Sequence, residues 1–319
     1  MSEKTANKSV PAISVVLATK GTKSMLLEKC IKSLQKQTFE KFEIVLVYSI
    51  YPKRLKGLFE ACNIITLKEN SSTLGAARNL GVKHAKGDLV AFIDDDCEAP
   101  ENWLRRIYLT FQQYPSLSCL GGPHLTPPEE CTNSPLKFAQ GSFNESFMQR
   151  IFIDRSAVGK IAGCNVAYRK EVFDKIGCLD EALKSGEDWE LHIRLAENGY
   201  HMRFEPNIFV WHHRQGLKHT FWDSSRMVPF YLSLKTLKYA KYESKFSRFY
   251  IANFLCLLLF ITLFISLFVF SLLLSFSLLG YFIFTMVRAR APLAILVTLA
   301  SLMGFYFGLF KYVASKLYH

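Results

Sequence analysis

Continuous apolar runs alternate with segments of helical periodicity over the first hundred residues, and this alternation constrains the fold more than any other feature. Apolar residues at helical spacing occupy Ser24–Gln37 and Leu74–Ala85, the second after a Ser71-Ser72-Thr73 cap. Apolar runs rich in β-branched residues are the expected strands: Ile13–Ala18, Glu43–Tyr48, Ile64–Leu67 and Leu89–Ile93. Uninterrupted apolar strands separated by helices predict an α/β fold with a mostly parallel sheet covered on both faces.

Three consecutive acids follow the last of these runs, in the sequence FIDDDCEAP. Ligands of such sheets bind outside the carboxyl ends of the strands, and Asp94, Asp95 and Asp96 leave the sheet at that end. In an extended chain Asp94 and Asp96 would point the same way and share a target. Carboxylates and phosphates are preferred ligands of Mg²⁺ and Mn²⁺, so a metal–diphosphate site is expected here. The alternative is that the acids cap the helix expected at Glu101–Gln113.

The preceding segment, LGAARNLGVKHAKGD, offers groups suited to phosphate. Gly75 stands at a loop-to-helix junction, and Arg78 lies one turn into the helix. A helix N-terminus with a nearby guanidinium suits phosphate oxygens. The chain contains neither GxxxxGK[ST] nor GxGxxG, which argues against a P-loop triphosphatase and a dinucleotide enzyme.

A second acidic pair opens a helix about 90 residues later, in the sequence GEDWEL. Gly186 ends a loop, and Glu187 and Asp188 follow it. Glu187 is explained as well by capping and by the helix dipole. Asp188 is the candidate for chemistry, because transfer to a hydroxyl acceptor needs a carboxylate base separate from the metal site.

Two histidines follow the strand expected at Ile208–Trp211. His212 or His213 is a candidate third metal ligand or diphosphate contact, and the alternative is a polar loop. Neighbours on a strand cannot both point into one site, and the sequence leaves the choice between them open.

Two charge-free runs near the C-terminus predict membrane insertion. Phe249–Val287 and Ala291–Phe310 contain no Asp, Glu, Lys or Arg, and each reaches the length of about 20 residues that spans a bilayer core. The first run is long enough for a hairpin that turns near Ser275–Gly280. We therefore expect two to three transmembrane helices within residues 249–319.

The formal net charge of +12 is concentrated ahead of these runs. Residues 214–248 form a basic segment in which Phe230, Leu234 and Leu237 share one helical face, and an interfacial helix is expected there, or else a simple linker helix. The positive-inside rule makes this side cytoplasmic. The adjacent expected membrane span favours a lipid partner over nucleic acid. No cleavable signal is evident, and the eight cysteines form no CxxC pair, which suits a reducing cytosol. We expect a multi-pass cell-membrane protein with residues 1–213 as its cytoplasmic domain.

In this order the motifs resemble those of family 2 glycosyltransferases of the GT-A fold, in their membrane-anchored bacterial and archaeal form. The resemblance covers Val10–Arg214 and is carried by ISVVLATKG, by STLGAARNLGVKHAKGDLVAFIDDD, by GCNVAYRKEVFDKIGCLDEAL, by GEDWEL and by WHHR. It implies a Rossmann-like sheet with flanking helices. The absent QxxRW motif argues against a polymer-extruding synthase.

The resemblance implies a role for each matching residue. Asp94 and Asp96 fall on the DxD motif that binds the metal, Mn²⁺ or Mg²⁺, on the donor diphosphate, and Asp95 lies between them. Asp188 would be the catalytic base. Thr19, Lys20, Gly21, Tyr48, Gly75, Arg78, Asp94 and Asp95 would lie on the donor side. Glu187, Trp189 and Asn165 would lie on the acceptor side.

The implied activity is a hexosyltransferase reaction that inverts the anomeric carbon, from a nucleotide-sugar donor to a lipid-linked or cell-surface glycan acceptor in glycan biosynthesis. The second strand ends Val47-Tyr48-Ser49, without the Asp that usually contacts the base, so Lys20 or Tyr48 is a candidate substitute and UDP, GDP and dTDP donors stay open. The alternatives are a polyprenyl-phosphate sugar synthase and a catalytically inactive membrane scaffold.

Overall fold

The computed structural model describes residues 10–70, 73–133, 150–158 and 160–213, together with isolated positions between 300 and 312. The chain divides into two compact units, Met1–Gly216 and Leu217–His319. The strands and helices named below belong to the first unit.

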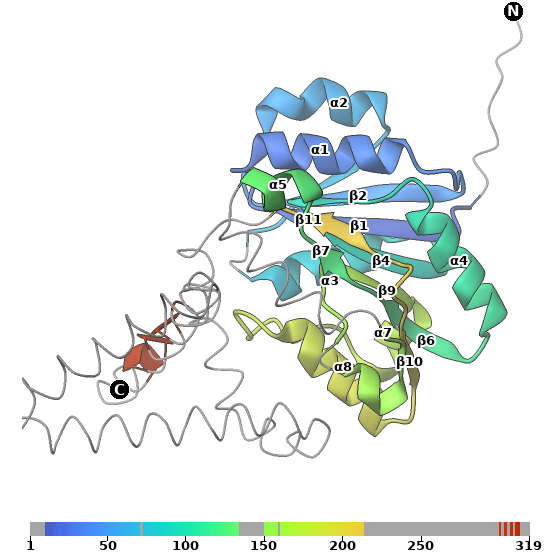
Figure 1. Ribbon diagram of the computed structural model, residues 1–319. Helices are drawn as coiled ribbons and strands as arrows, with labels where there is room; N and C mark the ends of the chain where they lie inside the picture. The colour runs from blue at the N-terminus through green and yellow to red at the C-terminus, as the bar shows by residue number, and fades with distance from the viewer. Residues whose placement is uncertain are drawn as a thin grey trace, which may run out of the picture. The chain divides into compact units, whose positions relative to one another are not determined.

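An eight-stranded sheet forms the centre of this unit, in the order β3-β2-β1-β4-β9-β6-β10-β8 (Figure 1). The first four strands in this order are parallel, as the sequence predicts. β9 runs antiparallel between β4 and β6, and β8 runs antiparallel to β10. The bounds are β1 Ile13–Thr19, β2 Phe42–Tyr48, β3 Ile65–Lys68, β4 Leu89–Asp94, β6 Leu117–Gly121, β8 Phe152–Ile153, β9 Asn165–Arg169 and β10 His201–Phe204.

Helices cover both faces of the sheet, with α1 and α4 on one face and α3, α7 and α8 on the other (Figure 1). β1 carries apolar residues on both faces, since Val15 and Leu17 join the core that includes α1, whereas Val16 lies against Gly81 of α3. The bounds are α1 Ser24–Gln35, α2 Lys56–Ala61, α3 Leu74–His84, α4 Trp103–Gln113, α5 Pro128–Asn133, α7 Glu171–Ile176 and α8 Glu187–Glu197, with short 3₁₀ helices η1 Lys53–Leu55 and η2 Asp154–Ala157.

A second, three-stranded sheet has the order β5-β11-β7. Its strands are β5 Cys97–Glu98, β7 His124–Leu125 and β11 Val210–His212. β5 follows β4 after a two-residue turn, so this small sheet continues directly from the end of the large one. It joins residues near positions 97, 124 and 212 beside the acidic triplet.

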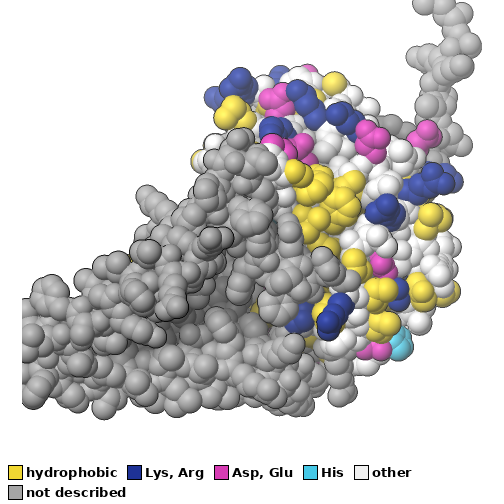
Figure 2. Space-filling model, viewed as in Figure 1, with side chains coloured by type: hydrophobic (Ala, Val, Ile, Leu, Met, Phe, Trp, Pro, Cys, Tyr) yellow, Lys and Arg dark blue, Asp and Glu magenta, His cyan; other side chains and the backbone are white. Residues whose placement is uncertain are grey.

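The predicted interfacial segment 214–248 lies outside the described residues, as does the predicted membrane domain 249–319 apart from the isolated positions. Among the residues that the structure describes, no helix has both the length and the apolar character needed to cross a membrane. On the face shown in Figure 2, Lys and Arg side chains of the described part lie among Asp and Glu side chains, with hydrophobic side chains gathered between them. On this face the described basic residues therefore form no single continuous patch.

Candidate active site

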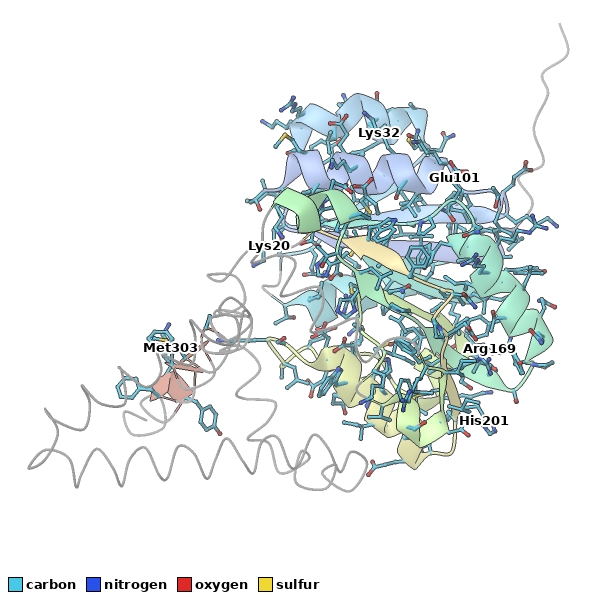
Figure 3. The ribbon with its side chains drawn as sticks, viewed as in Figure 1. Lys20, Lys32, Glu101, Arg169, His201 and Met303 are labelled. Carbon is cyan, nitrogen blue, oxygen red and sulfur yellow. The ribbon has the colours of Figure 1, made fainter. Side chains whose placement is uncertain are left out.

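The carboxyl ends of three neighbouring strands meet at one edge of the large sheet. The register pairs Thr19 with Tyr48, and Ala18 with Asp94. Lys20 lies at this edge, whereas Glu101 lies at the far end of the sheet (Figure 3). α4 begins beyond Glu101 and makes no side-chain cap hydrogen bond, so the alternative that the three acids cap this helix is wrong.

The three acids do not continue an extended chain. Asp94 is the last residue of β4, and Asp95 and Asp96 form a turn that leads into β5. The strand-like alternation expected for Asp94 and Asp96 is therefore wrong. Each carboxylate instead has its own donor, which offsets the repulsion among three adjacent negative charges.

Asp95 is held by the end of β1. The Thr19 hydroxyl donates to Asp95 Oδ2 at 2.6 Å, and the backbone N–H of Gly21 donates to Thr19 Oγ1 at 2.9 Å. Burial raises the pKa of Asp95 to about 6, the Thr19 hydrogen bond opposes this shift, and the neighbouring Asp96 charge adds to it. Thr19 therefore orients the Asp95 carboxylate by a direct hydrogen bond. Its place on the donor side stays a prediction.

Asp96 contacts two basic side chains, Lys23 and His212. Lys23 Nζ donates to its Oδ2 at 3.0 Å, and His212 Nε2 lies 3.2 Å from its Oδ1. Although burial acts to raise the pKa of Asp96, the hydrogen bond and charge of His212, together with Lys23, hold it well below its usual value. Asp96 is therefore a carboxylate anion held between two basic side chains.

Arg78 lies behind the edge and joins its two acidic parts. Its guanidinium donates to Asp94 Oδ1, to Glu187 Oε1 and to the carbonyl of Gly163, each at 2.8 Å, and it stacks 5.3 Å from the ring centre of Phe92. Only 3% of the side chain is exposed. Arg78 thus supports Asp94 from inside the protein, which corrects the expectation of a direct donor contact.

Gly163 lets the Arg78 side chain pass. A Cβ at this position would lie 2.4 Å from Nη1 of Arg78, closer than real atoms approach. The same residue donates its N–H to Asp188 Oδ2 at 2.6 Å. A single peptide segment therefore fixes Arg78 on one side and the candidate base on the other.

Glu187 and Asp188 take different roles at the start of α8. Glu187 is buried and paired with Arg78, so its expected place on the acceptor side is wrong. Burial, and then the Asp188 charge, raise the pKa of Glu187 to about 7, while Arg78 opposes the shift. Asp188 is half-buried, and Trp189 beside it donates its backbone N–H to Asp188 Oδ1 at 2.9 Å. The structure thus brings Asp188 to the edge of the sheet that carries Asp94. The acceptor-side role of Trp189 stays a prediction.

The small sheet separates the two histidines. His212 faces Asp96, and its ring lies 5.8 Å from that of His124. His213 is buried, with Nδ1 2.7 Å from Glu130 and Nε2 2.6 Å from Glu98. His213 thus joins two acidic side chains away from Asp96, and its candidacy as the metal ligand is wrong on geometric grounds. His212 stays the candidate.

The remaining donor-side residues lie around the ends of β1 and β2. Lys20 is exposed, and Tyr48 packs edge-on against Tyr51 with ring centres 5.1 Å apart. Gly21 has a φ of +78°, and a Cβ there would lie 1.8 Å from the carbonyl oxygen of Ile50. Gly21 is therefore required by the backbone, and base contacts by Lys20 and Tyr48 stay predictions.

Two other predicted residues serve the fold instead of a ligand. Asn165 is fully buried; its Nδ2 donates to the carbonyls of Pro123 and Ile208, and its Oδ1 accepts from Trp103. Its placement on the acceptor side is therefore wrong.

Gly75 packs against the backbone of Asp180, and a Cβ there would lie 3.1 Å from that carbonyl oxygen. The Thr73 hydroxyl caps this helix by accepting from the N–H of Ala76. Close packing, and not a phosphate, therefore accounts for the glycine.

A divalent cation fits this arrangement of donors. Asp96 Oδ1 and His212 Nε2 supply a carboxylate oxygen and an imidazole nitrogen 3.2 Å apart, and Lys23 contacts the other oxygen of the same carboxylate. Mn²⁺ accepts both donor types, whereas Mg²⁺ prefers oxygen. Asp94 contributes through Arg78 in this structure, and its predicted part as a ligand stays a prediction.

Sequence reasoning missed Lys23, Gly163 and the pair Cys97 and Cys164. Lys23 had no motif to mark it, since it lies just before α1 in a polar loop. Gly163 and Cys164 belong to the GCNVAYR block, in which only Asn165 had been singled out. The proximity of Gly163 to Asp188 was visible in neither spacing nor composition.

Comparisons with known proteins bear on the family and the fold. The model of the family described as glycosyl transferase family 2 matches residues 14–177. An uncharacterized glycosyltransferase of Haemophilus influenzae is 30% identical over 173 residues, which are 52% of this chain and 56% of the relative. The glucosyl-dolichyl phosphate glucuronosyltransferase of Haloferax volcanii is 25% identical over 198 residues, 58% of this chain and 60% of the relative. The chain thus covers less than two thirds of either relative.

One solved structure shares the fold over most of its length. The mannosyltransferase PcManGT from Pyrobaculum calidifontis, in complex with GDP-Man and Mn²⁺, matches with a TM-score of 0.62 and 14% identity over 93% of this chain and 87% of that chain. At this identity the match bears on the fold, which is the GT-A fold. With the family model covering half of its length, the chain belongs to glycosyl transferase family 2.

Proposed function

We propose that this chain is a metal-dependent, inverting glycosyltransferase that moves a sugar from a nucleotide-sugar donor to a hydroxyl group of a lipid-linked or cell-surface glycan. The observation that carries the proposal is that two separate carboxylates, Asp96 and Asp188, reach one edge of the sheet. The peptide segment at Gly163 and the Arg78 side chain connect Asp188 to Asp94, which stands two residues before Asp96. Asp96 would bind the cation, and Asp188 would act as the base on the acceptor hydroxyl.

The chain's own residues divide the work of the transfer. Asp96 and His212 would hold Mn²⁺ or Mg²⁺, which supplies positive charge for the departing diphosphate. Lys23 lies beside them and adds a second positive charge. Asp95, held by Thr19, lies next to them on the donor side.

Asp188 acts on the acceptor. It accepts hydrogen bonds from Gly163 and Trp189 through its two oxygens, which fixes the orientation of the carboxylate. It takes the proton from the acceptor hydroxyl as that oxygen forms its bond to the anomeric carbon, while the bond to the diphosphate breaks on the opposite side. The configuration of the sugar is thereby inverted.

A lipid-linked acceptor is supported by two observations outside the site. The Haloferax relative acts on a glucosyl-dolichyl phosphate by its name. The basic segment 214–248 and the charge-free run Phe249–Val287 that follows it have the composition of an interfacial and a membrane-inserted segment. We therefore propose membrane anchoring, with the site on the cytoplasmic side.

The function is tested with the full chain extracted in detergent. We expect it in the membrane fraction, and we expect Mn²⁺-dependent release of nucleoside diphosphate from one member of a panel of UDP-, GDP- and dTDP-sugars when lipid-linked glycan is present. Asp188→Asn should keep donor binding, measured by calorimetry, and lower turnover by about 100-fold or more. Asp174→Asn, an exposed carboxylate on α7, is the matched control and should keep full turnover.

Three results would contradict the proposal. Full turnover in Asp188→Asn would remove the base assignment. Transfer to free polyprenyl phosphate in preference to glycan would identify a polyprenyl-phosphate sugar synthase. Silence across the panel, together with no donor binding, would identify an inactive scaffold.

A further inference from the structure

Two buried thiols lie close to the His212 imidazole, which is also a candidate ligand of the proposed cation site. Cys97 is fully buried and Cys164 is 6% exposed. One atom from each of Cys97, Cys164 and His212 lies within 4.8 Å of the others. The proposed glycosyl transfer uses neither thiol.

The fold itself brings these three residues together. Cys97 begins β5 immediately after the acidic turn, and His212 of β11 pairs opposite it. Cys164 precedes β9, whose first residue, Asn165, pairs with Ile93 of β4. The three donors therefore come from three separate segments that two sheets hold at fixed register, which makes the cluster a built feature of the backbone.

The donor set has a different preference from that of the neighbouring site. Carboxylate oxygens suit hard cations such as Mg²⁺ and Mn²⁺, whereas two thiolates and an imidazole select Zn²⁺ and other thiophilic ions. We propose that Cys97, Cys164 and His212 form a second metal site that binds Zn²⁺ or a similar soft divalent cation.

The distances fit such an ion after a small contraction. Zinc–sulfur bonds of about 2.3 Å at tetrahedral angles place two sulfurs about 3.8 Å apart, so ligand atoms now within 4.8 Å need to move by about half an ångström each. Two thiolates neutralise the double charge of the ion, which suits a buried position. Asp96 Oδ1 lies 3.2 Å from His212 Nε2 and is not a member of the three-residue cluster.

Sharing of His212 gives the site a consequence. An ion held by the two sulfurs would occupy His212, which is assigned to the hard cation together with Asp96. The soft ion is therefore an inhibitor that acts beside the donor and not at the acceptor. This consequence rests on the proposed function, whereas binding of the soft ion does not.

Binding is tested first on the full chain in detergent, kept reduced with a phosphine. Titration with Co²⁺ should give thiolate-to-cobalt charge-transfer absorption and tetrahedral d–d bands, and Zn²⁺ should abolish both. Competition with a chromophoric chelator should show Zn²⁺ affinity lowered about 100-fold or more in Cys164→Ser, since even outer-shell changes cost about 10- to 100-fold. Cys178→Ser, an exposed thiol away from the cluster, is the matched control and should bind as the parent does.

The second arm measures donor binding. Zn²⁺ should weaken Mn²⁺-dependent nucleotide-sugar binding in the parent and in Cys178→Ser, and should lose this effect in Cys164→Ser, which keeps Asp96 and His212. Absence of the charge-transfer band, or equal Zn²⁺ affinity in Cys164→Ser and the parent, would overturn the proposal. Unfolded Cys164→Ser would be recognised by its circular dichroism, and Cys97→Ala then takes its place. A band without any effect on donor binding would support the metal site and overturn its inhibitory role, and absence of donor binding under all conditions would instead contradict the proposed function.

Discussion

At the scale of single residues, Arg78 is the side chain on which the site most depends. It is a buried cation with two acidic partners, the partly exposed Asp94 and the buried Glu187. A buried ion pair adds little stability relative to an apolar pair, but removing one member leaves an uncompensated charge. Loss of Arg78 should therefore lower the stability of the fold, because Glu187 would lose its cation, and should also disturb the Asp94 carboxylate at the proposed site.

Substitution of Arg78 tests this dependence. Arg78→Met should lower the free energy of unfolding by about 3–5 kcal/mol, because Glu187 would be buried without a cation. Adding Glu187→Gln should recover a large part of that loss, since the buried charge is then removed. Thermal or urea unfolding of the two variants provides the measurement, and equal stability of the single and double variants would show that Glu187 does not depend on Arg78.

Single residues also show where sequence reasoning ends. The acidic triplet and Asp188 could be found because strand ends and helix starts are visible in the pattern. Asn165 could not be interpreted correctly, because its role depends on carbonyls of Pro123 and Ile208 that only the folded chain places beside it. Long-range hydrogen bonds of this kind leave no periodic signal.

At the scale of elements, the small sheet decides which histidine meets the acids. β11 pairs with β5 so that Trp211 lies opposite Glu98 and His212 opposite Cys97. The backbone N–H of His213 also donates to the carbonyl of Asp96 at 2.9 Å. The sequence predicts a strand at Ile208–Trp211, and β11 covers Val210–His212. Its two-residue partners β5 and β7 carry too little alternation to be predicted, which is why the sequence leaves the choice between the histidines open.

The two histidines should respond differently to the same substitution. His212→Gln should weaken Mn²⁺ binding in the presence of donor by about 10-fold or more, because a metal ligand is lost. His213→Gln should leave Mn²⁺ affinity unchanged and lower thermal stability, because the contacts with Glu98 and Glu130 are weakened. Calorimetric titration and thermal unfolding separate the two effects. The reverse assignment would follow if His213→Gln lost Mn²⁺ affinity and His212→Gln did not.

Larger elements were predicted closely, with one exception in topology. The expected helix Ser24–Gln37 appears as Ser24–Gln35, and the expected strand Leu89–Ile93 as Leu89–Asp94. The antiparallel β9, inserted between β4 and β6, was not anticipated, since strand direction depends on connections and not on composition. This insertion is what brings Gly163 and Cys164 beside the acidic edge.

At the scale of the whole molecule, one buried histidine couples folding to pH. His192 of α8 is fully buried, its Nε2 lies 2.7 Å from the Tyr168 hydroxyl, and its Nδ1 has no hydrogen-bond partner among the described residues. Burial lowers the pKa of His192 to about 4, Asp188 opposes this shift, and Arg78 adds to it. The folded protein therefore holds this ring neutral.

Stability should fall on acidification for this reason. A histidine whose pKa is lower in the folded than in the unfolded state contributes stability above the unfolded value of about 6.5, and this contribution is lost as the pH falls towards about 4. His192→Gln should show a smaller drop in unfolding temperature between about pH 7 and pH 5 than the parent does. His84→Gln, exposed on α3, should show the same drop as the parent. An unchanged drop in His192→Gln would place the acid sensitivity elsewhere.

The Arg78 guanidinium has a consequence for the order of events in a catalytic cycle. It shares its charge between Asp94, on the proposed donor side, and the buried Glu187, which precedes the proposed base Asp188. If a bound donor draws Asp94 away from Arg78, the guanidinium charge acts more strongly on Glu187 and Asp188. If a bound acceptor draws Asp188 or Glu187 away, the charge acts more strongly on Asp94. We therefore expect donor and acceptor affinities to be thermodynamically linked through one side chain, with a linkage that is equal in both directions.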